Sequence, residues 1–242
     1  MADEPRFYYP DGRLCPEIPA RKGGMKAPTV VDARELGLVP SVTTILGIIR
    51  KPGLEQWMLN TTKDEAEAAR VAGADYGKRL HAAVSGWLSG HPDSDPELAA
   101  VMQKVGEFWT KQGWMARETE RSFAMSDYGG TVDLIAIDRV TERLVIADWK
   151  TQKTNGRANF YPEWGLQLAA YAHGMGVLGD CQLMSVVIST TEDMIVTQEW
   201  SDGERYLRDF NSAKDLWYST VGPGKDLRPE TTLQVRGQTV SG

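Results

Sequence analysis

"DLIAIDRVTERLVIADWK" (residues 133–150) contains two runs with the composition of buried strands, "DLIAI" and "RLVIADW", on either side of a short polar turn. Aliphatic runs separated in this way predict a β-hairpin. The first run opens with Asp133, and the second closes on Asp148 and Lys150. A hairpin in the core of a sheet would therefore carry a carboxylate on each strand, with a lysine two residues beyond the second carboxylate.

The alternation of side chains along the second strand predicts that its acid and its base lie together. Residues two apart in a strand share a face. Asp148 and Lys150 should therefore point the same way, above Leu144 and Ile146, while Trp149 points to the opposite face. The alternative for Asp148 and Lys150 is a solvated ion pair at a strand end, worth about 0 to 1 kcal/mol.

The chain around the hairpin alternates between strand and helix patterns. Three successive strands, then a helix, two strands and a closing amphipathic helix predict an α/β (α+β) fold with a central mixed sheet and helices on both faces. The corresponding segments are 116–125, 129–138, 143–150, 161–179, 182–190, 194–200 and 202–220.

The amino-terminal portion is predicted to be helical after an initial arm. Residues 1–40 are rich in Pro, Gly and charge without a sustained period, which predicts an extended, loop-like arm. A short helix should follow, with Ser41 or Thr43 as its cap. The pattern over 54–88 is mostly helical, with an interruption near 71–78.

A further helix is expected over 96–112, capped by Ser94 or Asp95, because Pro96 suits a first turn. The predicted organisation is an arm, one domain and a flexible tail. These divisions are 1–40, 41–221 (a helical part 41–113 and a sheet core 114–221) and 222–242.

Bulk properties narrow the class of protein. The 242 residues are 41% hydrophobic and 25% charged, and no apolar run approaches the roughly 18 residues of a membrane helix. The amino terminus has no signal-peptide core, and Cys15 and Cys181 are too few for a disulfide framework. These features predict a cytoplasmic protein. The net charge of −6 argues against nonspecific coating of nucleic acid, so a polyanionic partner needs a local basic patch or metal ions.

Convergence of the two hairpin acids would create a metal site. If Asp133 and Asp148 reach the same edge of the sheet, their oxygens suit Mg²⁺ or Mn²⁺. Glu120, on the preceding strand, could extend to the same cluster, and Glu118 is the less favoured candidate.

Three further residues could join this site. His81 could supply a nitrogen ligand from the helical portion, although a lone histidine beside an apolar stripe is more often a core or surface residue. Gln167 and Tyr171 lie four residues apart on the predicted helix, so they could orient Lys150, a metal-bound water or a phosphate. Their alternative is ordinary helix polarity.

Local composition also suggests a nucleic-acid surface. Basic residues gather along 139–157, and several aromatic residues near the site could stack on unpaired bases, although packing in the core is the simpler role for most rings. The basic residues are Arg139, Arg143, Lys150, Lys153 and Arg157, and the aromatic residues are Tyr128, Trp149, Phe160, Tyr161 and Trp164.

Five ordered blocks resemble the PD-(D/E)XK nuclease superfamily, specifically its RecB-like exonuclease branch. Two upstream blocks are similar to mitochondrial genome-maintenance exonucleases and their phage-encoded relatives. The five blocks are "GKRLH" (77–81), "ETE" (118–120), "GGTVD" (129–133), "DWKT" (148–151) and "WGLQLAAY" (164–171), and the upstream blocks are "PSVTTIL" (40–46) and "LEQW" (54–57).

The resemblance implies a restriction-endonuclease-like core and a set of roles. It implies that His81, Asp133, Asp148 and the carbonyl of Trp149 ligate the divalent metal. It implies that Glu120 is an auxiliary acid and that Lys150 positions the attacking water or stabilises charge on the phosphate. Gln167 and Tyr171 would form the supporting helix motif. The second acid is Asp148 where the superfamily often has Glu, and this branch commonly accepts Asp there.

The leading hypothesis is a Mg²⁺- or Mn²⁺-dependent DNA exonuclease acting on single strands or on ends, in phage or bacterial DNA replication, recombination or repair. Its expected partners are DNA and a single-strand-binding or annealing protein, without a membrane. One alternative is an endonuclease with the same core. Another is a catalytically silent nuclease-like module that binds DNA or docks a protein. An iron–sulfur nuclease is disfavoured because two cysteines cannot supply four thiolates.

Overall fold

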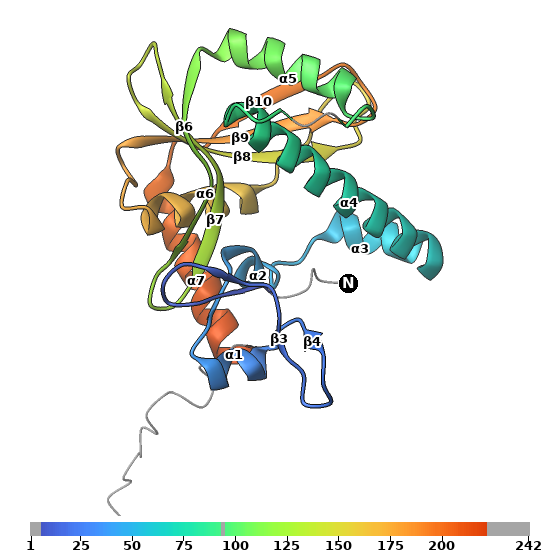
Figure 1. Ribbon diagram of the computed structural model, residues 1–242, viewed down its shortest axis with the longest axis vertical. Helices are drawn as coiled ribbons and strands as arrows, with labels where there is room; N and C mark the ends of the chain where they lie inside the picture. The colour runs from blue at the N-terminus through green and yellow to red at the C-terminus, as the bar shows by residue number, and fades with distance from the viewer. Residues whose placement is uncertain (1–5, 93–94, 222–242) are drawn as a thin grey trace, which may run out of the picture.

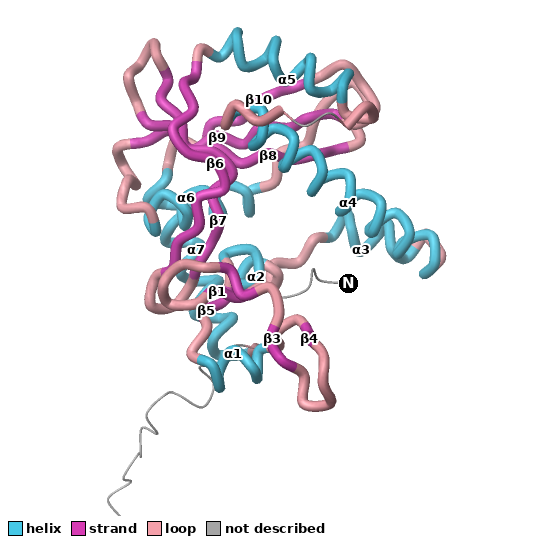
Figure 2. Tube along the Cα trace, viewed as in Figure 1, coloured by secondary structure: helices cyan, strands magenta, loops and turns pink. Residues whose placement is uncertain are grey.

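The structure is a computed structural model that describes residues 6–92 and 95–221. Its centre is a five-stranded sheet in the order β10-β9-β8-β7-β6 (Figure 2). The strands are β6 (Trp114–Ala124), β7 (Gly129–Asp138), β8 (Leu144–Gln152), β9 (Cys181–Ser189) and β10 (Ile195–Glu199). The β8–β9 pair is parallel and the other pairs are antiparallel. The prediction of a mixed central sheet is confirmed.

Helices cover both faces of this sheet (Figure 1). The helices α4 (Lys63–Leu88) and α5 (Ala99–Gln112) pack on one face. On the other face lie α6 (Pro162–Gly174), α7 (Gly203–Thr220) and the short α2 (Val42–Leu46). Because α6 connects two parallel neighbours, β8, α6 and β9 form a βαβ unit. The arrangement is consistent with a restriction-endonuclease-like fold.

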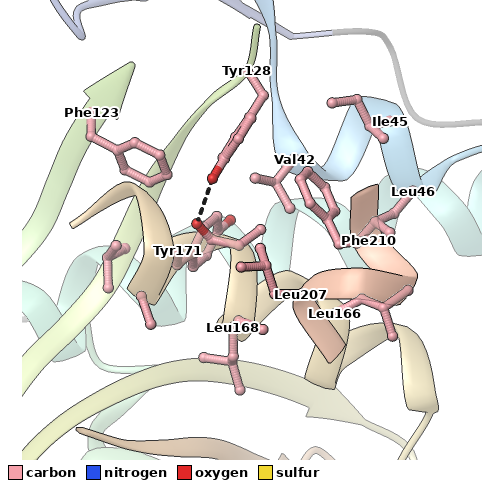
Figure 3. Close-up of a cluster of buried hydrophobic side chains, with 14 of the residues drawn as sticks. Val42, Ile45, Leu46, Phe123, Tyr128, Leu166, Leu168, Tyr171, Leu207 and Phe210 are labelled. Atoms are coloured by element: carbon pink, nitrogen blue, oxygen red, sulfur yellow. Dashed lines mark hydrogen bonds between the residues drawn. The ribbon is translucent and has the colours of Figure 1, made fainter. Parts of the chain in front are cut away.

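The alternation predicted for β8 is present in the core. Trp149 and Ala147 belong to the cluster under α4 and α5. Ile146 belongs to the cluster on the α6 face, where Leu168 of α6 and Phe210 of α7 are also fully buried (Figure 3). Burial of such side chains stabilises the fold by roughly 1.5 to 3 kcal/mol each. The polar residues on the α6 face of β8 are therefore held against a rigid layer.

The segment 6–40 contains more regular structure than its composition predicts. Helix α1 (Val30–Leu36) was not expected. It has a capping box in which Thr29 and Asp32 bond each other's backbone N–H groups, and Gly37 ends it with a left-handed φ of 65°. Seven residues are too few to establish a helical period, so only these caps could have indicated it. The short strands are β1 (Phe7–Tyr8), β2 (Leu14–Cys15), β3 (Ile18–Pro19), β4 (Met25–Lys26) and β5 (Val39–Pro40).

The helical region 52–88 is divided at a different place from the one predicted. Helix α3 (Pro52–Leu59) ends before Thr62, which caps α4 through a reciprocal pair with Glu65. Helix α4 then runs without a break through 71–78, so the interruption predicted there is wrong. A glycine inside a helix costs only about 1 kcal/mol, which is less than the helix gains from its packed second half.

Helix α5 begins later than predicted. Residues 96–98 form a turn and the helix starts at Ala99, while Asp95 accepts the backbone N–H of Glu97. Ser94, the other predicted cap, and the predicted tail over 222–242 lie outside the described residues. Across 6–92 and 95–221, the model contains no helix with both the length and the apolar character needed to traverse a bilayer.

Candidate metal and active site

The candidate site lies where strands β7 and β8 part. Their ladder ends at the pair Leu134–Ala147. Asp133 and Asp148 are the next residues on each strand, just beyond the last pair. From this point β7 remains paired with β6 and β8 remains paired with β9. The sheet therefore forks at the two acids, and side chains can occupy the space that a continuous ladder would close.

The side chain of Asp133 spans this fork. Its Oδ2 accepts the backbone N–H of Trp149 at 2.9 Å, so the carboxylate takes over where main-chain pairing has stopped. The same oxygen lies 3.4 Å from Nδ1 of His81, which reaches the fork from α4. Burial alone would lower the pKa of His81, but contact with Asp133 and the charges of Asp133 and Asp148 outweigh it and raise the pKa above its usual value. The structure thus brings His81 to the first hairpin acid.

Asp148 is almost completely buried, with 3% of its surface exposed. Its Oδ1 accepts a hydrogen bond from Nε2 of Gln167 at 2.7 Å. Its Oδ2 lies 2.6 Å from Nζ of Lys150 but has no partner in hydrogen-bond geometry. Burial raises the pKa of Asp148 to about 6, with Lys150 lowering it and Asp133 raising it further. Asp148 therefore offers a buried oxygen that lies against the Lys150 ammonium.

Helix α6 supplies the groups that hold Asp148 and Lys150 in place. Oε1 of Gln167 accepts from Nζ of Lys150 at 3.0 Å, and its Nε2 also donates to the hydroxyl of Tyr171 at 2.9 Å. The ring of Tyr171 lies on β7 at Gly130, where an added Cβ would come within 2.7 Å of the ring. The spacing of Gln167 and Tyr171 thus gives one connected network, as the helical period suggested.

Glu120 reaches the site through an unusual backbone conformation. It lies on β6 after a shift of register between Ala116 and Glu118, and its φ is 52°. Ligand atoms of Glu120, His81 and Asp133 all lie within 4.8 Å of one another. Burial and then the charge of Asp133 raise the pKa of Glu120 to about 7. Glu118 instead forms an ion pair with Arg121 at 3.3 Å.

The donor set fits a hard divalent cation. Carboxylates that approach one another repel unless a cation or a proton intervenes, and burial strengthens the repulsion. Oxygen donors with one imidazole suit Mg²⁺ or Mn²⁺. The ligand atoms of His81, Glu120 and Asp133 lie within 4.8 Å of one another. Asp148, whose buried Oδ2 lies against Lys150, stands outside that group. Trp149 contributes its N–H to Asp133, and its carbonyl stays a predicted ligand.

Tyr8 is a neighbour of the site that the sequence did not indicate. Its hydroxyl shares a hydrogen bond of 2.9 Å with Oγ1 of Thr131, two residues before Asp133. Burial raises the pKa of Tyr8, and the charges of Glu120 and Asp133 raise it further. Pairing of β1 with β5 and packing of Tyr8 against Gly129 of β7 bring this residue to the fork, so no local pattern could have indicated it.

The expected basic rim is wrong for Arg139 and Arg143. Arg139 lies in the turn between β7 and β8 and Arg143 directly precedes β8, so they sit at the end of the hairpin opposite Asp148, with Arg143 roughly 17 Å away along the strand at 3.3 Å per residue. Nη2 of Arg143 donates to the carbonyl of Cys181 there. Proximity in sequence across a hairpin turn does not give proximity in space. Lys153, by contrast, directly follows β8 at the fork end.

The aromatic candidates divide by burial. Tyr128 and Trp149 are 1% and 3% exposed, so they are core residues and the base-stacking role is wrong for them. Phe160 and Trp164 are half-buried, and Tyr161 is 44% exposed. Only the last three remain available near the site.

Comparisons with solved structures give remote likenesses, among them two at 15% and 14% identity. No protein-family model matches the chain, and no curated protein matches it. Among solved structures it is similar to SSO0001, with 15% identity, a TM-score of 0.37 and coverage of 74% of this chain and 76% of that chain. It is also similar to an alkaline exonuclease (LHK-Exo) from Laribacter hongkongensis, with 14% identity, a TM-score of 0.29 and coverage of 57% and 81%. At these values the functional argument rests on the site itself.

Proposed function

We propose that the protein is a divalent-metal-dependent DNA exonuclease that hydrolyses phosphodiester bonds in single-stranded DNA or at DNA ends. The observation that carries this proposal is the fork, where His81 contacts Asp133 while Lys150 and Gln167 contact Asp148. Buried acids beside a lysine and an imidazole suit hydrolysis of a charged ester.

The residues at the fork divide into metal-holding and charge-stabilising groups. His81, Glu120, Asp133 and Asp148 would hold the cation. A bound Mg²⁺ or Mn²⁺ would supply a water of lowered pKa and offset charge on the phosphate. Lys150 would place its ammonium against the phosphate oxygens as negative charge grows on them. Gln167 fixes the direction of that ammonium, and Tyr171 fixes Gln167, so both are positioning residues.

The finer parts of the proposal rest on the sequence resemblance. They are membership of the RecB-like branch near the mitochondrial and phage exonucleases, action from an end, and a role in phage or bacterial replication, recombination or repair. A cytoplasmic location and cooperation with a single-strand-binding or annealing protein follow from that setting. The division into an arm (1–40) and one nuclease domain (41–221) is proposed from the composition and periodicity of the sequence.

The proposal is tested with end-labelled linear DNA and a circular single strand, each incubated with Mg²⁺ or Mn²⁺ and with a chelator. We expect the linear strands to be degraded in either metal, the circle to persist, and the chelator to stop degradation. Cleavage of the circular strand would contradict the exonuclease proposal and would indicate an endonuclease. Binding of DNA without cleavage in any metal would replace the enzyme by a silent binding module.

A further inference from the structure

Three aromatic side chains gather immediately after the strand that carries Lys150. They are Phe160, Tyr161 and Trp164, here called the aromatic cluster. The rings of Phe160 and Trp164 meet edge to face at 6.0 Å, and those of Tyr161 and Trp164 at 5.1 Å. The Nζ of Lys150 lies 5.7 Å from the centroid of the Trp164 ring. The Trp164 ring of the cluster thus lies over the ammonium group of Lys150, a residue of the proposed active site.

The three rings differ in their anchoring. Phe160 and Trp164 pack against the hydrophobic core on the α6 face. Tyr161 belongs to neither core cluster and is 44% exposed. Core packing accounts for the first two rings but not for the third, since the exposed Tyr161 ring meets Trp164 at its edge and makes no side-chain hydrogen bond as the cap of α6.

The loop that carries the cluster is held in a defined shape. Gln152 and Asn159 bond each other, with Nε2 donating to the Asn159 carbonyl and Oε1 accepting its N–H. Glu192, from the β9–β10 turn, accepts the N–H of Gly156 at 2.9 Å and the hydroxyl of Thr154. The Thr154 hydroxyl and the Gly156 N–H also lower the pKa of Glu192. An exposed ring on a braced loop loses little freedom when a ligand covers it.

We propose that Tyr161 stacks on an unpaired nucleobase next to the phosphate that faces Lys150. This inference rests on the proposed function and deepens it by naming the substrate as a strand with unpaired bases. Tyr161 meets Trp164, and the Trp164 ring lies beside the Lys150 ammonium. An exposed ring one neighbour away from a fixed ammonium suits a nucleotide, because the base offers a π-face and the adjoining phosphate a negative charge. A base within a duplex has both faces covered by its neighbours and cannot take this position.

Binding of single-stranded oligothymidylate to the full chain tests this inference. Three oligonucleotides are compared by fluorescence anisotropy with Ca²⁺ in place of Mg²⁺: one intact, one abasic at the last two 5′ positions and one abasic at the last two 3′ positions. We expect one of the abasic strands to bind about tenfold more weakly than the intact strand. Tyr161→Ala should remove this difference, and Tyr161→Phe should keep it because the ring alone stacks.

Trp57→Ala is the matched control, since Trp57 is a comparably exposed aromatic residue (41%) on α3 and should leave the difference unchanged. Equal binding of all three strands by the parent protein, or a difference that persists in Tyr161→Ala, would overturn the inference. Absence of measurable DNA binding would overturn it together with the proposed function. Base-dependent binding without cleavage in Mg²⁺ or Mn²⁺ would support the stacking role while contradicting the proposed nuclease.

Discussion

The two ends of the β7–β8 hairpin carry the same kinds of residue in different surroundings. At the turn, Asp138 accepts the backbone N–H groups of Val140 and Thr141, and Arg143 donates to a backbone carbonyl. At the fork, Asp133 and Asp148 are buried. Asp138 is satisfied by backbone groups of its own turn, whereas the acids at the fork also meet side chains brought from α4 and α6. The type of residue at a strand end therefore indicates little about function. Whether its partners come from the same turn or from distant helices indicates more.

The largest expected effect distinguishes the acids at the two ends. Asp133→Asn and Asp148→Asn should each reduce DNA cleavage by more than about a hundredfold, because each removes a carboxylate that would hold the metal. Asp138→Asn keeps the oxygen that caps the turn and should cleave like the parent protein. Initial rates on a labelled single strand measure both. Equal losses for Asp138→Asn and Asp148→Asn would remove the distinction between the two ends.

A smaller effect tests whether α6 positions the lysine. Gln167→Leu should lower kcat by about tenfold to a hundredfold with little change in KM, because Lys150 loses the acceptor that directs it. Tyr171→Phe removes only the hydroxyl and keeps the ring against Gly130, so its loss should be smaller. Steady-state kinetics with circular dichroism as a folding control would separate these cases. A rise in KM at unchanged kcat would indicate substrate binding instead.

Metal binding should be visible in stability. At a Mn²⁺ concentration of about 100 times Kd, the free energy of unfolding should rise by about 2.7 kcal/mol. For a chain of this size that corresponds to roughly 5 to 10 °C in Tm. His81→Ala and Asp133→Asn should lose most of this shift, and Asp138→Asn should keep it. Thermal melts with and without Mn²⁺ measure this change in Tm. An unchanged Mn²⁺-dependent rise in Tm for Asp133→Asn would contradict the role of Asp133 as a metal ligand.

The smallest expected effect uses the two non-glycine residues with positive φ among those described, Glu120 at the fork end and Glu142 at the turn, with φ values of 52° and 59°. Glycine tolerates this conformation, so each Glu→Gly change should relieve about 1 kcal/mol of strain. Chemical denaturation should therefore show both variants stabilised. Only Glu120→Gly should lose cleavage activity, because it removes a carboxylate proposed to hold the metal, and an equal loss in Glu142→Gly would contradict that difference between the two ends.

Local patterns predicted the part of the site that lies within single elements. The period of two placed Asp148 with Lys150 and opposite Trp149, and the helical period placed Gln167 with Tyr171. His81 and Tyr8 arrive through packing of α4 and β1, and the left-handed backbone of Glu120 has no sequence signal, so their positions depend on tertiary structure. His81 entered the prediction through the family resemblance and as an uncertain nitrogen ligand.

The errors outside the site have a related origin. The break predicted within α4 relied on glycines whose cost is smaller than the gain from packing, and the capping box at Thr62 was the decisive signal instead. The basic rim was predicted from sequence proximity, which an antiparallel turn converts into separation. In both cases long-range packing or strand pairing, and not the local sequence, determines the structure.

The proposed metal site requires His81, Asp133 and Asp148 to meet around one cation. A crystal structure of the protein with Mn²⁺ would test this directly through the anomalous difference density of the metal. We expect a strong peak in the fork at Mn²⁺ concentrations that support DNA cleavage. The metal ion at this peak should be bonded to carboxylate oxygens of Asp133 and Asp148 and to the His81 imidazole. A peak bound elsewhere, or an empty fork at those concentrations, would contradict the proposed metal site.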